Sequence, residues 1–141
     1  IPGEAWMAID IRTTPAIGHP DLLGRLRAAC QGVSAGTGVD LDLSVIDDRP
    51  ATETPADSAL VRAVVEAHRK VAGEEPPLGG VPGATDGTIL WRDAGIPIVT
   101  YGPGGKWIAH QVDEFVEVAD LVRCAEVYEL AALIFLGSFG Y

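Results

Sequence analysis

Strict alternation of apolar and polar side chains is the feature that most restricts the fold of this chain. Residues 39–45 place an apolar side chain at every odd position, with aspartate or serine between them. A similar period of two runs through residues 5–12. Because successive side chains of a strand point to opposite faces, both segments are predicted to be half-buried β-strands.

A helix is predicted between these two segments. Pro20 and Asp21 suit a first helical turn, and apolar side chains then recur at helical spacing up to Val33. We therefore expect an α+β portion at residues 1–50, formed by a strand, a helix and a strand. Two strands and one helix enclose a thin core, so this portion is expected to need further sheet.

Residues 51–141 have the pattern of an α/β segment. Thr54 is the expected cap of a first helix, and further helices are predicted over residues 86–94 and 118–136. A short buried strand is predicted at residues 96–101. The expected fold class is thus α/β, joined to the smaller α+β portion.

Composition excludes several classes of protein. The 141 residues include 10 lysines and arginines against 20 acidic residues, a formal net charge of −10. Nucleic-acid binding without sequence preference needs a positive field and is not expected. No run of about 18 apolar residues is present, so no membrane span is predicted. Cys30 and Cys124 are expected to be buried small side chains rather than a metal pair or a disulfide framework.

His110 is the histidine of most chemical interest, because it lies in a polar loop that follows a predicted strand and a glycine-rich turn. An acid such as Glu114 can orient the far ring nitrogen of a metal-bound histidine. Zinc takes three or four protein ligands, so one histidine cannot hold it, and an ordinary loop histidine remains the alternative. His68 is interpreted as a solvated helix-face residue and His19 as a helix-start or turn residue.

Several short motifs occur in a characteristic order. They are Ile9-Asp10-Ile11-Arg12, Ala84-Thr85-Asp86-Gly87, Gly95-Ile96-Pro97, Tyr101-Gly102-Pro103-Gly104 and Ala109-His110-Gln111-Val112-Asp113-Glu114. Together they resemble the C-terminal part of the zinc-dependent aminoacylase and carboxypeptidase family, of the acetylornithine deacetylase and succinyl-diaminopimelate desuccinylase type. The resemblance covers essentially the whole chain.

The resemblance implies an architecture and an activity. Residues 1–50 would be part of a lid or dimerisation domain with a four-stranded sheet, and residues 51–141 the C-terminal segment of a catalytic domain. The parent enzyme would be a cytoplasmic homodimer that cleaves the amide bond of N-acyl amino acids or small peptides with two zinc ions, or with cobalt or manganese. The other metal ligands and the general base are expected upstream of Ile1, so the chain alone is expected to be inactive.

The resemblance also implies roles for single residues. His110 matches the last metal ligand of the family, and Glu114 would be an acid that supports a ligand. Thr85 and Asp86 match a loop near the substrate, although Thr88 stands where many relatives have arginine. Arg12 matches a lid arginine that either contacts substrate or forms a structural ion pair. The alternative function is a non-catalytic lid, dimerisation or binding module, which an upstream reading frame without metal-ligand motifs would favour.

Overall fold

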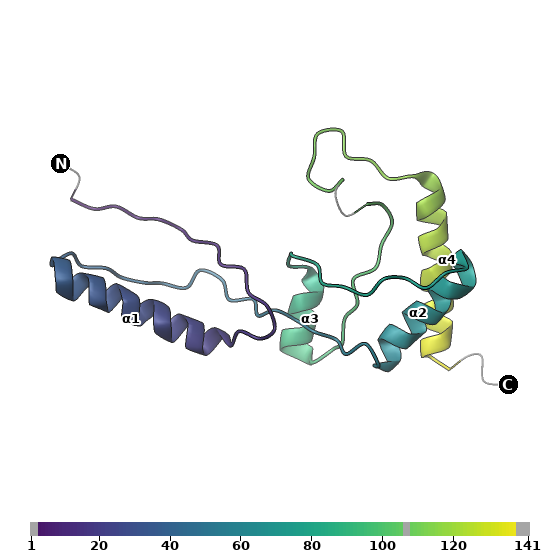
Figure 1. Ribbon diagram of the computed structural model, residues 1–141, viewed down its shortest axis with the longest axis horizontal. Helices are drawn as coiled ribbons and strands as arrows, with labels where there is room; N and C mark the ends of the chain where they lie inside the picture. Colours follow the sequence, from purple (N-terminus) through teal and green to yellow (C-terminus); the bar gives the residue numbers. More distant parts are fainter. Residues whose placement is uncertain (1–2, 106–107, 138–141) are drawn as a thin grey trace. The chain divides into compact units, whose positions relative to one another are not determined.

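The computed structural model describes residues 3–105 and 108–137, drawn as a ribbon in Figure 1. Within these residues the chain has four α-helices, which are α1 (His19–Thr37), α2 (Ala59–Ala72), α3 (Asp86–Ala94) and α4 (Val118–Phe135). The described residues form two compact units. Unit 1 comprises the residues up to Glu53 together with Pro82–Ala94, and unit 2 comprises Thr54–Val81 and the residues from Gly95 onward. The domain boundary expected between residues 50 and 51 stays a prediction.

The expected α/β fold with a strand–helix–strand lid is wrong. No residue of the described ranges is in a β-strand, including segments 5–12, 39–45 and 96–101. A strand requires backbone hydrogen bonds to a neighbouring strand, whereas alternation records only which side chains are apolar. The Leu41 N–H instead donates to the Ser34 hydroxyl of α1 at 3.1 Å. Met7 and Ile9, which lie on one face of the expected strand at 5–12, stay 81 % and 68 % exposed.

Helix α1 confirms the helix predicted between these segments. Pro20 lies in its first turn, where the missing N–H costs no hydrogen bond. Gly38 ends the helix with a φ of 73°, a left-handed conformation that glycine adopts without steric cost. No residue of α1 is buried. The helix therefore forms from local sequence signals with little packing behind it.

Side-chain hydrogen bonds join distant segments within unit 1. The His19 ring, at the start of α1, contacts the Thr13 hydroxyl through Nε2 at 2.8 Å and the Asp48 carboxylate through Nδ1. The Asp48 carbonyl in turn accepts a hydrogen bond from the Arg92 guanidinium of α3 at 3.1 Å. His19 is thus a helix-start residue, as expected, and it also links α1 to the segment that carries Asp48.

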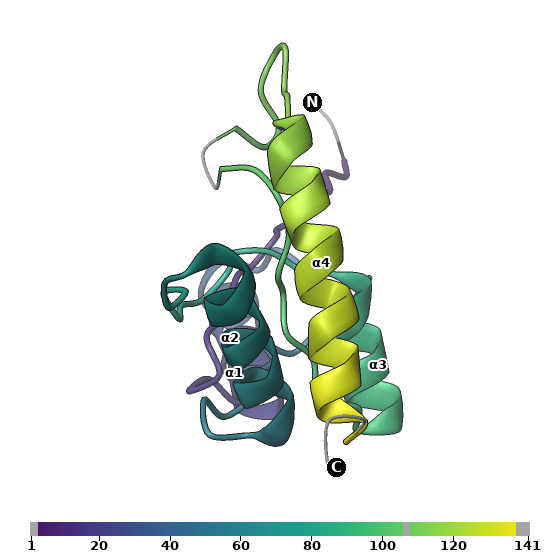
Figure 2. The ribbon, with the colours of Figure 1, turned by 90° about the vertical axis from the view of Figure 1, so that its right-hand side faces the viewer.

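Unit 2 is built on the packing of α2 against α4, which lie side by side in Figure 2. Ala67 of α2 and Val127 of α4 are completely buried, and Ala131 is nearly so. Small side chains at the contact let the two helices approach closely. Partly buried side chains surround this centre, namely Val64, Val71, Tyr101, Leu130 and Ile134. This apolar cluster is the main core of the described structure.

The cap of α2 is Ser58 rather than Thr54. The Ser58 hydroxyl accepts the Val61 N–H at 3.3 Å, which satisfies one of the free donors of the first turn. Thr54 lies four residues earlier, where its hydroxyl donates to the Ile98 carbonyl at 2.5 Å and accepts the Ile98 N–H at 3.2 Å. Thr54 therefore ties the 96–101 segment to the start of unit 2, in place of the backbone ladder that was expected there.

Candidate functional site

The turn that carries His110 has an unusual backbone. His110 and Asp113 both have positive φ angles, 64° and 61°. Residues other than glycine adopt this left-handed region infrequently, and histidine and aspartate are among those enriched there. Such strained positions persist where the surroundings hold them, and they concentrate at functional sites. The backbone geometry alone therefore makes this turn a candidate functional site.

Glu114 stabilises the turn that carries His110 through a hydrogen bond. Its carboxylate accepts a hydrogen bond from the main-chain N–H of His110 at 2.9 Å. The contact is to the backbone of His110 and leaves the imidazole ring untouched. Glu114 thus stabilises the left-handed conformation at His110, and a role toward a bound metal stays a prediction.

The His110 imidazole is exposed and has no hydrogen-bond or ionic partner among the described residues. A ring in that state offers its nitrogens to a metal or a substrate. However, the described ranges contain no group of three or more histidine, cysteine or acidic side chains arranged to hold a metal ion. The donor set therefore fits a single ligand position and does not by itself form a complete metal shell.

The other predicted site residues lie in unit 1. Thr85 and Asp86 are exposed at the start of α3, where the Thr85 carbonyl accepts the Thr88 N–H at 3.0 Å. Asp86 is in the first turn, where a negative charge suits the helix dipole. Thr88 is the buried polar residue of the described structure, 6 % exposed. The side chains available to a ligand here are therefore Thr85 and Asp86.

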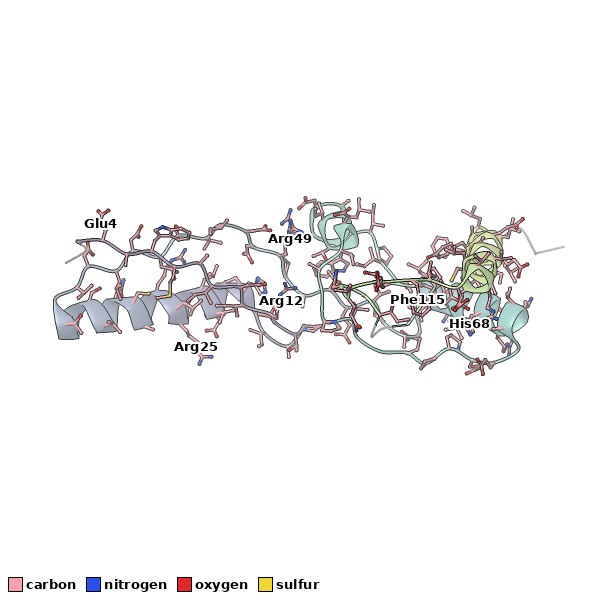
Figure 3. All side chains as sticks on the ribbon, turned by 90° about the horizontal axis from the view of Figure 1, so that it is seen from above. Glu4, Arg12, Arg25, Arg49, His68 and Phe115 are labelled. Carbon is pink, nitrogen blue, oxygen red and sulfur yellow. The ribbon has the colours of Figure 1, made fainter. Side chains whose placement is uncertain are left out.

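Arg12 forms an ion pair with its neighbour Asp10. Its Nε and Nη2 atoms lie 3.0 and 2.7 Å from Asp10 Oδ2, and both side chains are largely exposed. Arg12 is labelled in Figure 3. Exposed pairs of this kind contribute little to stability. The structure thus shows Arg12 in an ion pair, and its contact with substrate stays a prediction. Arg12, Thr85 and Asp86 belong to unit 1, whereas His110 and Glu114 belong to unit 2.

An aromatic network in unit 2 was not found by the sequence analysis. His68 Nδ1 lies 2.7 Å from the Tyr101 hydroxyl, and the Tyr128 hydroxyl donates to the Tyr101 carbonyl. His68 is therefore a half-buried, hydrogen-bonded residue where α2 meets α4 (Figure 3), and its interpretation as a solvated helix-face residue is wrong. Residues 68, 101 and 128 are far apart in sequence, so no local pattern indicates this cluster.

Burial shifts two acid–base equilibria in this network. It raises the pKa of the Tyr101 phenol above its ordinary value, and neighbouring Cys124 and Tyr128 raise it further. Burial also raises the pKa of the Cys124 thiol, and the negative charge of Asp120 adds to that effect. In both cases the neutral form is favoured because the charged form loses its hydration. The Tyr101 phenol and the Cys124 thiol are thus held in their neutral forms at neutral pH.

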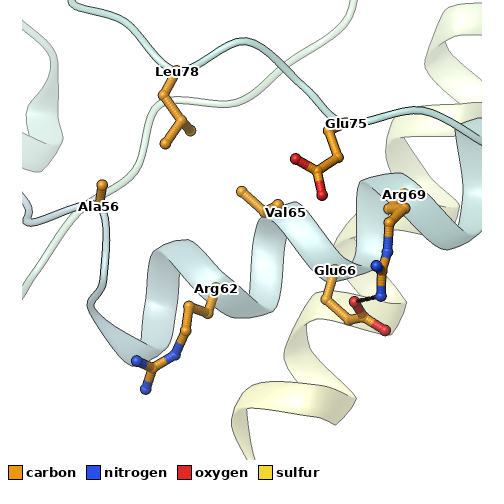
Figure 4. Close-up of a pocket in the computed structure, with 7 residues that line it drawn as sticks. All are labelled: Ala56, Arg62, Val65, Glu66, Arg69, Glu75 and Leu78. Carbon is orange, nitrogen blue, oxygen red and sulfur yellow. Dashed lines mark hydrogen bonds and ion pairs between the residues drawn. The ribbon is translucent and has the colours of Figure 1, made fainter.

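A shallow pocket of about 330 Å³ lies on another face of α2 (Figure 4). Leu78 and Glu75 face Val65 across it, whereas the Arg62 guanidinium points away from both. Arg69 is held by Glu66 in an ion pair. The pocket is lined by Ala56, Arg62, Val65, Glu66, Arg69, Glu75 and Leu78. None of the predicted site residues contributes to it, so it is separate from the His110 turn.

Comparison with known proteins identifies the family. The sequence pattern of peptidase family M20/M25/M40 matches residues 6–133, and the chain therefore belongs to this family. That finding confirms the resemblance drawn from the motifs. None of the helices in the described part of the chain is long and apolar enough to cross a membrane.

The chain is similar to several curated relatives. It is 40 % identical over 88 residues to N-formyl-4-amino-5-aminomethyl-2-methylpyrimidine deformylase of Bacillus subtilis, covering 60 % of this chain and 20 % of the relative. It is 33 % identical over 131 residues to succinyl-diaminopimelate desuccinylase of Nitrosomonas europaea, covering 92 % and 33 %. An uncharacterized metallohydrolase of Methanococcus maripaludis is 29 % identical over 141 residues, covering 91 % and 34 %.

The chain spans only 20 % to 34 % of the length of these three relatives. No solved structure matches it. The family assignment thus rests on sequence similarity.

Proposed function

We propose that the full-length protein is a metal-dependent hydrolase that cleaves an amide bond in a small N-acyl amino acid or peptide. Membership in peptidase family M20/M25/M40 supports this proposal, as do relatives named deformylase, desuccinylase and metallohydrolase. The structural observation that carries it is the exposed His110 imidazole, which has no partner among the described residues, on a left-handed turn stabilised by Glu114.

His110 is proposed as one ligand of a zinc ion, in a site of two such ions that cobalt or manganese could also fill. Imidazole nitrogen is a common zinc ligand, and an exposed ring can coordinate without breaking an existing hydrogen bond. When bound, such an ion supplies a Lewis acid for the amide carbonyl. The part played by this chain is to present the His110 ring on a turn whose backbone Glu114 fixes.

Arg12, Thr85 and Asp86 are proposed to contact the substrate. An N-acyl amino acid carries a carboxylate, and a guanidinium binds carboxylates well because its N–H groups can bond both oxygens. Arg12 already pairs with the Asp10 carboxylate, so the carboxylate of the substrate would replace that of Asp10 when Arg12 binds it. Thr85 and Asp86 offer a hydroxyl and an acceptor for polar groups of the substrate.

The assembly and location of the protein are also proposals. The family resemblance favours a homodimer in the cytoplasm. Light scattering of the full-length protein at several concentrations would measure the assembly state, and a monomer throughout would contradict the dimer.

The test uses variants of the full-length protein on the His110 turn. His110→Asn removes the imidazole but keeps a residue that tolerates left-handed backbone, so it isolates the ring from the turn. Val112→Ala changes a neighbouring side chain that is 92 % exposed and serves as the matched control. Zinc content, melting temperature and hydrolysis of N-formyl, N-acetyl and N-succinyl amino acids are measured.

We expect His110→Asn to lose zinc and most turnover without a change in the melting temperature of the metal-free protein, and Val112→Ala to behave as the wild type. If the wild-type protein hydrolyses none of a broad panel of N-acyl amino acids and dipeptides with zinc bound, the catalytic proposal fails and the non-catalytic binding module is favoured. If His110→Asn keeps its zinc and turnover, the assignment of His110 fails.

A further inference from the structure

One hydrogen bond fixes the point where the chain leaves the core of unit 2 toward His110. The Tyr128 hydroxyl of α4 donates to the main-chain carbonyl of Tyr101. The next residue, Gly102, lies against the same hydroxyl, because a Cβ added there would be 3.9 Å from the Tyr128 oxygen. Tyr101 packs against the α2 and α4 core, whereas residues 102–105 are exposed. Tyr128 therefore holds the chain at Tyr101, where the chain leaves the core and enters the loop.

Both limbs of this loop are connected to one helix. The outgoing limb, from Glu114 to Glu117, continues directly into α4 at Val118. The described part of the incoming limb, residues 102–105, is tied to α4 through the side chain of Tyr128 and the packing of Tyr101. Near the base, Gly104 approaches the Val116 side chain, with an added Cβ only 3.7 Å from its Cγ2 atom. The Tyr128 hydrogen bond thus helps to set the spacing of the two limbs.

The ring and the hydroxyl of Tyr128 contribute separately. Its ring packs edge-on against the ring of Tyr101, with centroids 5.8 Å apart and an interplanar angle of 76°. A phenylalanine at this position keeps that contact and removes only the hydrogen bond to the carbonyl. On the other side of Tyr101, the hydroxyl bond to His68 acts on the side chain and leaves the carbonyl free. Replacing Tyr128 or Tyr101 by phenylalanine therefore removes one hydroxyl hydrogen bond in each case, and only the bond of Tyr128 is to the backbone carbonyl.

We infer that Tyr128 is a positioning residue for His110, acting through the Tyr101 carbonyl, the contact of Gly104 with Val116, and the hydrogen bond from the His110 N–H to Glu114. This inference rests on the proposed role of His110 as a metal ligand. The Tyr128 hydroxyl holds the incoming limb against α4, and the turn at His110 is thereby presented in one arrangement. Without the hydroxyl, the loop samples wider spacings, and the imidazole spends less time where a ligand is needed.

The test compares Tyr128→Phe with Tyr101→Phe in the full-length protein. Three quantities are measured: zinc affinity, hydrogen exchange of the loop amides of Ile108 and His110, and melting temperature. Those two amides are suitable probes because each donates a hydrogen bond within the loop, to the Gly105 carbonyl and the Glu114 carboxylate. Loss of a neutral hydrogen bond to a backbone carbonyl changes an equilibrium constant, here that of zinc binding or of loop opening, by about threefold to tenfold.

We expect Tyr128→Phe to weaken zinc binding and to speed exchange of both amides by about threefold to tenfold. Tyr101→Phe is expected to lower the melting temperature while leaving zinc affinity and loop exchange within about twofold of the wild type. The inference is overturned if Tyr128→Phe changes only the melting temperature, or if both variants disturb the loop equally. Failure of the proposed function is distinguishable, because His110→Asn would then retain zinc while Tyr128→Phe still speeds the exchange.

Discussion

The Nδ1 atom of His68 lies 2.7 Å from the hydroxyl of Tyr101, and this contact joins α2 to the 96–101 segment, whose Tyr101 packs against the α2 and α4 core. The two rings also meet edge-on, with centroids 5.8 Å apart. Loss of the imidazole leaves the half-buried phenol without this partner. His68→Ala is therefore expected to lower the free energy of unfolding by about 1 to 2 kcal/mol.

Chemical denaturation of His68→Ala and of the wild type measures this difference. His110→Asn is the matched histidine control, because the exposed His110 ring has no partner among the described residues. Its unfolding curve should overlay that of the wild type when both proteins are free of metal. An unchanged midpoint for His68→Ala would contradict the importance of the contact.

The two cysteines should react at different rates. Cys124 is buried, and burial raises the pKa of its thiol, so the reactive thiolate is scarce and shielded. Cys30 is only half-buried on α1, where no residue is fully buried. A disulfide reagent that releases a coloured thiolate is expected to modify Cys30 at least about tenfold faster than Cys124. Cys30→Ala should remove the fast phase and Cys124→Ala the slow one; the opposite assignment would show that the α2 and α4 contact opens readily.

Alkaline pH should destabilise unit 2. The folded state raises the pKa of the Cys124 thiol above its ordinary value of 9.0 and that of the Tyr101 phenol above 10.0. The folded state then keeps protons that the unfolded chain has released, so the free energy of unfolding falls as pH rises. The contribution is complete below about pH 9 and is lost as pH passes through the raised pKa values.

Unfolding measured from pH 7 to pH 11 tests this expectation. The wild type should lose stability above pH 9, and the combined variant Cys124→Ala, Tyr101→Phe should show a shallower decline. Equal slopes for the two proteins would mean that these groups are not the ones that titrate.

The cap of α2 offers a stability prediction. Ser58→Ala removes the hydroxyl that accepts the Val61 N–H, and loss of such a cap costs about 1 kcal/mol. Ser44→Ala, an exposed serine outside the helices, is the matched control and should leave the free energy of unfolding unchanged. Thermal unfolding of the two variants measures both effects, and equal melting temperatures for them would contradict Ser58 as the cap.

The helices were predictable from the sequence because their signals are local. α3 was predicted at residues 86–94, and Gly95, with a φ of 65°, follows its end as expected. Gly73 and Gly137 follow α2 and α4 for the same reason, since each adopts positive φ. A glycine stop or a proline in the first turn acts within a few residues, so one sequence is enough to recognise it.

Features that depend on distant residues were not predictable in this way. The alternation at 39–45 indicated a strand, but a strand needs a partner, and Leu41 bonds to Ser34 instead. Thr54 is of a residue type that commonly caps helices, yet its hydroxyl bonds to Ile98, which is 44 residues away. For the candidate site, the motif drew attention to His110 and Glu114, but the bond to the His110 backbone and the left-handed turn appear only in three dimensions.

Metal binding by His110 can be followed directly through the ring nitrogens of the histidines. In the full-length protein with ¹⁵N-labelled histidine, zinc is added and the signals of His19, His68 and His110 are followed, with His110→Asn to assign the last. His19 and His68 already hydrogen-bond to Asp48 and Tyr101, so their signals should stay in place. We expect the signal of one His110 ring nitrogen to shift and to saturate with zinc; a His110 signal that does not move while zinc binds would contradict its role as a ligand.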